Sequence, residues 1–271
     1  MTPDTPSSEF FLDRHMDAAA VVPVAGGDAA VITVRSPEHE EGNEDAAAII
    51  PISGTDGVIA LADGMGGHAH GAEAARLALE AIDASVRGRD PEEELRTSIL
   101  NGFEMANETV RALGVGAGTT LAVAEIQGQW IRTYHVGDSG VVVVGQRGSV
   151  RTRTVDHSPT GYALEAGLMD EHEAIHHEER HILSNAVGAK DMRIDVGSSV
   201  QMGSLDTVLL ASDGLFDNLV LDAILDRIRT GPVADGVLEL CRSARRRMTR
   251  PSDTQPSKPD DLTIVAFRRP A

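Results

Sequence analysis

The chemistry of this sequence is concentrated in aspartates placed beside its most apolar segments. Five of them lie directly before or after an expected strand: Asp45, Asp63, Asp138, Asp213 and Asp260. A strand end is rigid and an aspartate side chain is short, so such carboxylates can converge with little loss of conformational freedom. Converging carboxylates repel one another unless a cation neutralises them, and all-oxygen ligand sets suit Mg²⁺ or Mn²⁺. This placement predicts a divalent metal site.

Glycine follows two of these aspartates, in Asp63-Gly64 and Asp213-Gly214. A glycine lets the backbone approach a neighbouring group closely, and the Gly64 carbonyl could itself be a metal ligand. An Asp-Gly pair taken alone is more often an ordinary turn. Five acidic sites beside strongly apolar strands favour a metal site over a set of unrelated turns.

Strands and helices must bring these positions together, and both are visible as hydrophobic periodicity. The short connections after residue 119 indicate an antiparallel meander, because a parallel pair needs a long crossover. The elements come in blocks and not in strict alternation, which favours a single α+β domain with helices packed on antiparallel sheets. Strands are expected at 31–35, 46–52, 58–62, 119–126, 130–136, 141–145, 150–155, 206–212 and 262–267, and helices at 71–86, 91–113, 222–229 and 233–248.

Composition limits the partners that this chain can have. Its 271 residues carry 24 basic and 42 acidic side chains, so the formal net charge is −18. Such a charge disfavours binding to nucleic-acid phosphates or to an anionic membrane surface. No apolar run approaches the roughly 20 residues of a membrane span, and the N-terminal residues lack the layout of a signal peptide. We therefore expect a cytoplasmic protein without nucleic-acid or membrane partners.

The sequence also predicts the domain boundaries and the environment of its single cysteine. Residues 1–25 are expected to form a flexible leader, and residues 26–271 a single domain. The single cysteine, Cys241, cannot form an internal disulfide, which suits a reducing compartment. Its helical Leu-Glu-Leu-Cys-Arg context lacks a phosphate-binding glycine loop, so we expect a buried core thiol and not a nucleophile.

Eight short motifs stand in order along the chain. They are Gly42-Asn43-Glu44-Asp45, Ala62-Asp63-Gly64-Met65-Gly66-Gly67-His68, Gly118-Thr119-Thr120-Leu121, His135-Val136-Gly137-Asp138-Ser139, Val155-Asp156-His157-Ser158, Leu183-Ser184-Asn185-Ala186-Val187-Gly188, Ala211-Ser212-Asp213-Gly214-Leu215-Phe216-Asp217 and Pro259-Asp260-Asp261-Leu262-Thr263. Each motif alone is weak, but together they closely resemble the metal-dependent Ser/Thr protein phosphatases of type 2C in their bacterial form. The resemblance runs from about residue 30 to residue 267.

The resemblance implies a four-layer αββα fold, a β-sandwich of two antiparallel sheets flanked by helical layers, with two Mn²⁺ or Mg²⁺ ions at one end. By motif position, Asp63 would bridge the two ions and the Gly64 carbonyl would hold one of them. Asp213 and Asp260 would hold the other ion. Asp45 would contact a metal directly or lie just behind its ligands.

The resemblance also assigns residues around that centre. Asp138 matches the residue that binds a third, weaker metal, and residues 159–191 match a mobile flap beside the cleft. Glu44 and Asp261 would lie just behind the metal ligands, with Asp261 in place of the usual asparagine. His68 resembles a bacterial loop histidine near the substrate, and a purely structural loop role fits it equally.

One departure from the family pattern concerns phosphate binding. The family usually has an arginine five residues before the aspartate of the first motif, and this chain has Glu40 there. His39 or Arg35 could substitute for that arginine, whereas Glu40 would repel phosphate. This departure keeps a second interpretation open, a pseudo-phosphatase that retains the fold as a binding or scaffold module.

A competing motif lies within the expected flap. The run from His172 to His176 matches the H-E-x-x-H signature of zinc proteases, which needs a helix that presents both imidazoles. Its surroundings are charged on every side, and no glutamate occurs between Glu179 and Glu239 to complete one protease class. His181 is misplaced for the longer histidine motif. A solvated polar helix is therefore favoured over a zinc protease.

The sequence thus predicts a metal-dependent phosphatase that hydrolyses phosphoserine and phosphothreonine in proteins. Two cations about 3.5–4 Å apart would lower the pKa of a bridging water and clamp the phosphoryl oxygens. The expected mechanism is direct attack by a metal-bridging hydroxide, without a phosphoenzyme. The expected partners are phosphorylated protein substrates and a cognate Ser/Thr kinase that the phosphatase opposes.

Overall fold

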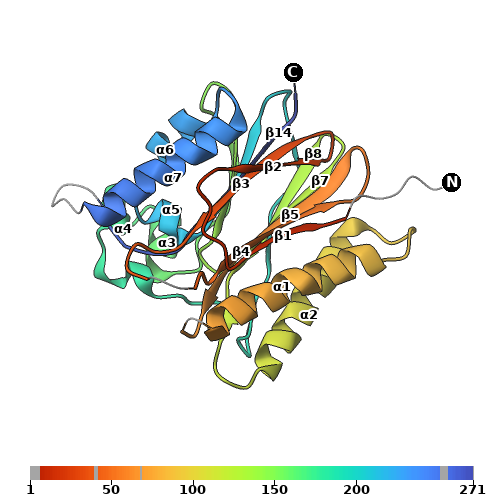
Figure 1. The fold of residues 1–271 in the computed structure, drawn as a ribbon, viewed down its shortest axis with the longest axis horizontal. Coiled ribbons are helices and arrows are strands. Elements are labelled where there is room, and N and C mark those ends of the chain that lie inside the picture. Colours follow the sequence, from red (N-terminus) through yellow and green to blue (C-terminus); the bar gives the residue numbers. More distant parts are fainter. Residues whose placement is uncertain (1–6, 40–41, 68, 251–255, 271) are drawn as a thin grey trace.

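The computed structural model describes residues 7–39, 42–67, 69–250 and 256–270, and Figure 1 shows its architecture. Two antiparallel sheets pack face to face, and helices cover the outer face of each sheet. This arrangement confirms the predicted α+β fold with layers in the order α, β, β, α.

The first sheet carries two long helices on its outer face. Those helices, α1 (Ala69–Gly88) and α2 (Leu95–Ala112), lie side by side (Figure 1). In spatial order its strands are β1 (Glu9–Leu12), β4 (Asp45–Pro51), β5 (Asp56–Met65), β7 (Leu121–Gln127), β8 (Trp130–Val136) and β11 (Asp195–Val196), with β6 (Gly118–Thr119) beside β5 and β12 (Val200–Gln201) beside β8.

The second sheet is covered by α6 (Leu221–Ile228) and α7 (Val233–Thr249), with the short α5 (Asp213–Phe216) directly after one of its strands. The spatial order of this sheet is β10 (Val150–Arg153), β9 (Gly140–Val144), β13 (Thr207–Ala211), β14 (Leu262–Arg268), β3 (Gly27–Val34) and β2 (Ala20–Val24). Between β10 and β11 the chain forms α3 (Pro159–Glu165), α4 (Glu171–Ile175) and a 3₁₀ turn (Glu178–His181).

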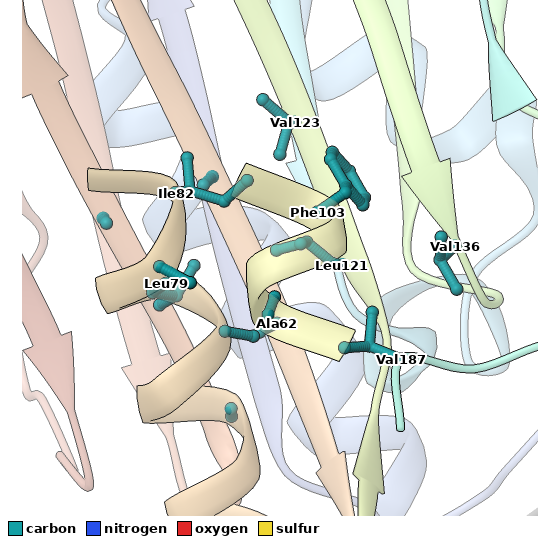
Figure 2. Close-up of a cluster of buried hydrophobic side chains, with 14 of the residues drawn as sticks. Ala62, Leu79, Ile82, Phe103, Leu121, Val123, Val136 and Val187 are labelled. Atoms are coloured by element: carbon teal, nitrogen blue, oxygen red, sulfur yellow. The ribbon is translucent and has the colours of Figure 1, made fainter. Parts of the chain in front are cut away.

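Side-chain alternation along β4 contributes to two cores at once, because neighbouring residues of a strand point to opposite faces. Ala46 and Ala48 pack in the core under α1 and α2, whereas Ala47 and Ile49 pack between the two sheets. Figure 2 shows the core under the helices, where Phe103 of α2 packs against the sheet. Burial on both faces explains why this strand is a continuous apolar run in the sequence.

The prediction of a flexible leader over residues 1–25 is wrong for the part that the structure describes. β1 pairs with β4 and β2 pairs with β3, and Phe11 and Val22 are buried between the sheets. Each strand has only four or five residues, too few for alternation to stand out among polar neighbours. Pro23 is tolerated because β2 is an edge strand. Residues 1–6 of the expected leader lie outside the described residues.

The other elements lie close to their expected ranges. The second helix begins at Leu95 and not at Pro91, which lies in the preceding turn. Cys241 is buried in the core between α7 and the second sheet, as the sequence predicts. Within the described ranges, no helix has the length and apolar character needed to cross a membrane.

Candidate active site

Antiparallel pairing brings the aspartates together, because the start of one strand lies beside the end of the next. Asp45 begins β4 and pairs in register with Asp63 near the end of β5. In the second sheet, β13 ends shortly before Asp213 and its neighbour β14 begins shortly after Asp260. Ser212 joins the two sheets, since its hydroxyl donates a 2.7 Å hydrogen bond to Oδ2 of Asp45.

We call Asp45, Asp63, Asp213 and Asp260 the aspartate group. Two of its carboxylate oxygens are buried without a hydrogen-bond partner in the described parts of the chain. They are Oδ1 of Asp45, a residue only 1% exposed, and Oδ1 of Asp213. A buried carboxylate oxygen without a partner is unfavourable, and a bound cation is a partner that removes the penalty. The donor set therefore fits a divalent cation that prefers oxygen ligands.

The electrostatics of the aspartate group and of its neighbours Asp138 and Asp217 also favour a bound cation. Burial raises the pKa of Asp45, Asp63 and Asp138 well above the usual range, and neighbouring carboxylates raise it further. Burial and the charge of Asp213 raise the pKa of Asp217 to about 6. Positive charge close to such carboxyl groups lowers their pKa and favours the ionised form.

A lysine supplies positive charge at this site. Nζ of Lys258 forms an ion pair with Asp213 and lies 3.1 Å from Oδ2 of both Asp217 and Asp260. Sequence reasoning assigned no role to Lys258 or to Asp217. The four-residue spacing from Asp213 to Asp217 was an available signal for a shared helix face, whereas the position of Lys258 depends on tertiary structure.

Asp261 is occupied by backbone groups. Its Oδ1 accepts a hydrogen bond from the Ser36 N–H and its Oδ2 accepts one from the Glu44 N–H, each 2.7 Å long. Asp261 thereby attaches the connection between β3 and β4 to the start of β14. The Glu44 side chain reaches α1, where a Cβ on Gly71 would lie 1.7 Å from its Oε2. Both residues hold backbone segments around the aspartates.

Asp138 follows β8 in a turn at which Gly137 has a φ of 108°. A cleft lies beside this turn, and α3 and α4 form part of its wall. The region predicted as a flap therefore lies next to the aspartate group. The charged residues that line the cleft are Asp138, Arg153, Asp156, Glu171, Arg180, Asp213 and Asp217.

His157 holds the Asp138 turn through contacts that the motifs alone did not reveal. Its Nδ1 accepts hydrogen bonds from the Gly137 N–H and from Nδ2 of Asn185, so its Nε2 carries the proton. That Nε2 lies 3.1 Å from Oδ2 of Asp195, and the His135 ring stacks on the imidazole at 4.3 Å. The signal for this network was the pair of histidines in the His135-Val136-Gly137-Asp138 and Asp156-His157-Ser158 motifs.

Two of the candidates for phosphate binding lie within the described residues. Arg35 and His39 lie in the connection after β3, where the Arg35 N–H donates a hydrogen bond to Nδ1 of His15. Glu40 and His68 lie outside the described residues. Their expected effects on phosphate binding stay predictions.

The zinc-protease motif does not form a helix that presents both histidines. α4 has five residues and ends before His176, and a capping box of Asp170 and Glu173 begins it. His172 and His176 are exposed, and their rings contact each other at 4.5 Å. The structure therefore disfavours a zinc protease.

Comparisons with known proteins agree with this geometry. A sequence profile of the family described as Protein phosphatase 2C matches residues 38–233. The chain is 33% identical over 199 residues to Protein phosphatase PhpP of Streptococcus pneumoniae, which covers 69% of this chain and 79% of that protein. The chain therefore belongs to the protein phosphatase 2C family, and it is a serine/threonine protein phosphatase.

Solved structures share the fold. The serine/threonine phosphatase of S. agalactiae superposes with a TM-score of 0.77 and 25% identity, covering 90% of this chain and 100% of that one. The catalytic domain of the phosphatase PstP, solved in complex with 2 manganese ions, gives a TM-score of 0.68 and 26% identity, covering 89% and 96%. Relatives named as phosphatases favour the enzyme over the pseudo-phosphatase.

Proposed function

We propose that the aspartate group binds two divalent cations and that the protein uses them to hydrolyse phosphoserine and phosphothreonine in other proteins. The observation that carries this proposal is the pair of buried, unpartnered oxygens, Oδ1 of Asp45 and Oδ1 of Asp213. One belongs to a strand of the first sheet and the other follows a strand of the second. The manganese ions in the PstP structure support it.

Specific residues would hold the cations. In this proposal Asp63 and the Gly64 carbonyl bind at the end of β5, while Asp213 and Asp260 bind beside the second sheet. Asp45, held by the Ser212 hydroxyl through its Oδ2, would offer its unpartnered Oδ1. When bound, the cations lower the pKa of water and neutralise charge on the phosphoryl oxygens. Asp138, in the turn after β8, is the proposed ligand of a third ion.

The chain offers no cysteine for a covalent intermediate. Cys241 is its single cysteine, and its side chain is buried under α7 at 3% exposure. Burial raises the pKa of the thiol to about 11, so a reactive thiolate does not form at neutral pH. Water is therefore the proposed acceptor of the phosphoryl group.

Two arginines beside the carboxylates suit a phosphorylated substrate. Arg153 and Arg180 line the cleft together with Asp138 and Asp213. Guanidinium groups bind phosphate through charge-assisted hydrogen bonds, so these side chains would orient the phosphorylated residue beside the cations. The substrates would be proteins phosphorylated by a Ser/Thr kinase that this phosphatase opposes.

Phosphate release from three peptides of one sequence, carrying phosphoserine, phosphothreonine or phosphotyrosine, tests the proposal. We expect release from the first two, loss of release in EDTA, and recovery with excess Mn²⁺ or Mg²⁺. Asp213→Asn should lower the rate at least about 100-fold, since metal binding contributes several kcal/mol to transition-state stabilisation. Release that persists in EDTA, or an unchanged rate in the variant, would contradict the proposal.

A further inference from the structure

This chain contains few lysines, and one of them contacts the aspartate group. The sequence has 22 arginines and only two lysines, Lys190 and Lys258. Lys190 is exposed, whereas Lys258 contacts Asp213, Asp217 and Asp260. A lysine ammonium is a compact point charge with three donors, unlike the planar fork of arginine, so it resembles a metal ion more closely.

The backbone of Lys258 is held so that its side chain reaches the carboxylates. The Lys258 N–H donates a 2.9 Å hydrogen bond to Oδ1 of Asn218, and Nδ2 of Asn218 donates a 2.8 Å bond to the Lys258 carbonyl. Asn218 is fully buried and also donates to the Gly214 carbonyl beside Asp213. One buried amide therefore aligns the lysine with the start of α5.

The three carboxylates that contact Lys258 are arranged around an ammonium. Oxygens bound at roughly 2.1 Å to Mg²⁺ can be no more than about 4.2 Å apart, whereas oxygens about 3 Å from an ammonium can stand about 6 Å apart. Among the described residues, the one group of three ligating side chains with atoms within 4.8 Å of one another is His135, His157 and Asp195. Asp213, Asp217 and Asp260, which all contact Nζ of Lys258, do not form such a group.

We propose that Lys258 is a built-in competitor for the divalent cation at Asp213 and Asp260. Its ammonium neutralises three carboxylates in the metal-free chain, and it must leave them before they can close on a metal. The inference rests on the proposed function, because it takes these aspartates as metal ligands. It implies that the lysine weakens metal affinity and stabilises the metal-free fold.

Substitution of the lysine measures that competition directly. Lys258→Met removes the charge and keeps the length of the side chain, so the dissociation constant for Mn²⁺ should fall about 10-fold or more in calorimetric titration of the metal-free protein. Lys258→Arg keeps the charge and should tighten binding less. Lys190→Met, the same change at the other lysine, should leave the affinity unchanged. Unchanged or weaker Mn²⁺ binding in Lys258→Met would overturn the proposal.

A measurement on the unmodified protein covers the case in which Lys258→Met does not fold. The two lysines can be acetylated with a small reagent and quantified by mass spectrometry, with Lys190 as the internal reference. Lys258 should be protected in EDTA and acetylated several-fold faster with saturating Mn²⁺. Equal or slower acetylation of Lys258 with metal would overturn the proposal. Absence of Mn²⁺ binding to the wild-type protein would instead contradict the proposed function itself.

Discussion

At the scale of single residues, a buried histidine sets part of the pH range in which the fold is stable. His135 is 4% exposed, its Nε2 donates a 2.8 Å hydrogen bond to the Val155 carbonyl, and its ring stacks on His157. Burial lowers its pKa to about 4, compared with about 6.5 in an unfolded chain. Because the folded pKa is the lower one, the stability contributed by neutral His135 is present above about pH 6.5 and is lost as the pH falls towards 4.

We expect His135→Gln to remove this acid sensitivity, since glutamine keeps an amide donor but does not titrate. Between pH 7 and pH 5 the wild-type protein should lose about 2 kcal/mol more unfolding free energy than the variant. Urea unfolding of both proteins in EDTA, followed by circular dichroism, measures the difference. Parallel losses in the two proteins would show that His135 does not carry the effect.

At the scale of elements, the end of β5 and the start of α1 approach each other unusually closely. A Cβ on Gly64 would lie 2.1 Å from the Gly71 carbonyl oxygen and 2.9 Å from the Glu44 carbonyl oxygen. The Gly64 N–H also donates a 3.1 Å hydrogen bond to that Glu44 carbonyl. The strand and the helix can meet here only because residue 64 has no side chain, and this contact fixes the neighbouring Asp63.

Gly64→Ala should separate these two elements. We expect it to lower the unfolding free energy by about 1–3 kcal/mol and to weaken Mn²⁺ binding, because backbone atoms must move to admit the methyl group. Gly88→Ala is the matched control, since a Cβ at the end of α1 meets nothing within 4 Å. Urea unfolding and calorimetric titration compare the two. Equal results for both variants would refute the role assigned to Gly64.

The elements also show how far sequence reasoning reaches. β8 occupies its predicted range because seven residues suffice to show a pattern, whereas β1 and β2 are short edge strands that depend on distant partners. The placement of aspartates at strand ends followed from the same apolar runs. The contact of Lys258 with the aspartates did not, because Asn218, 40 residues away, aligns it. Nor could spacing show that Asp261 binds the backbone of Ser36 and Glu44.

At the scale of the whole molecule, metal binding and stability should be linked. In the described parts of the chain the two sheets share no strand pairing, and their aspartates meet at one end. Raised pKa values mean that these carboxyls destabilise the metal-free fold progressively as the pH rises from the unfolded value of about 4 through the folded value. A cation that binds only the folded state adds about 2.7 kcal/mol when present at 100 times its dissociation constant.

Asp45→Asn should separate the destabilisation of the metal-free fold by buried carboxylates from the stabilisation by a bound cation. At pH 7.5 in EDTA we expect the variant to be about 1–2 kcal/mol more stable than the wild-type protein, because one buried repulsive charge is gone. Added Mn²⁺ should stabilise it less than it stabilises the wild-type protein. Asp28→Asn makes the same change at an exposed residue of β3 and should behave like wild type. A less stable Asp45→Asn protein with an undiminished Mn²⁺ response would contradict this account.

The most direct test of the central claim is to measure Mn²⁺ binding and phosphate release together in Asp63→Asn. Asp63 lies opposite Asp45 and is the proposed bridge between the two cations. We predict a folded protein that binds fewer Mn²⁺ ions per chain than wild type in calorimetric titration and releases phosphate from a phosphothreonine peptide at the background rate. A folded Asp63→Asn protein that keeps the wild-type rate would show that the reaction does not take place at this group of aspartates.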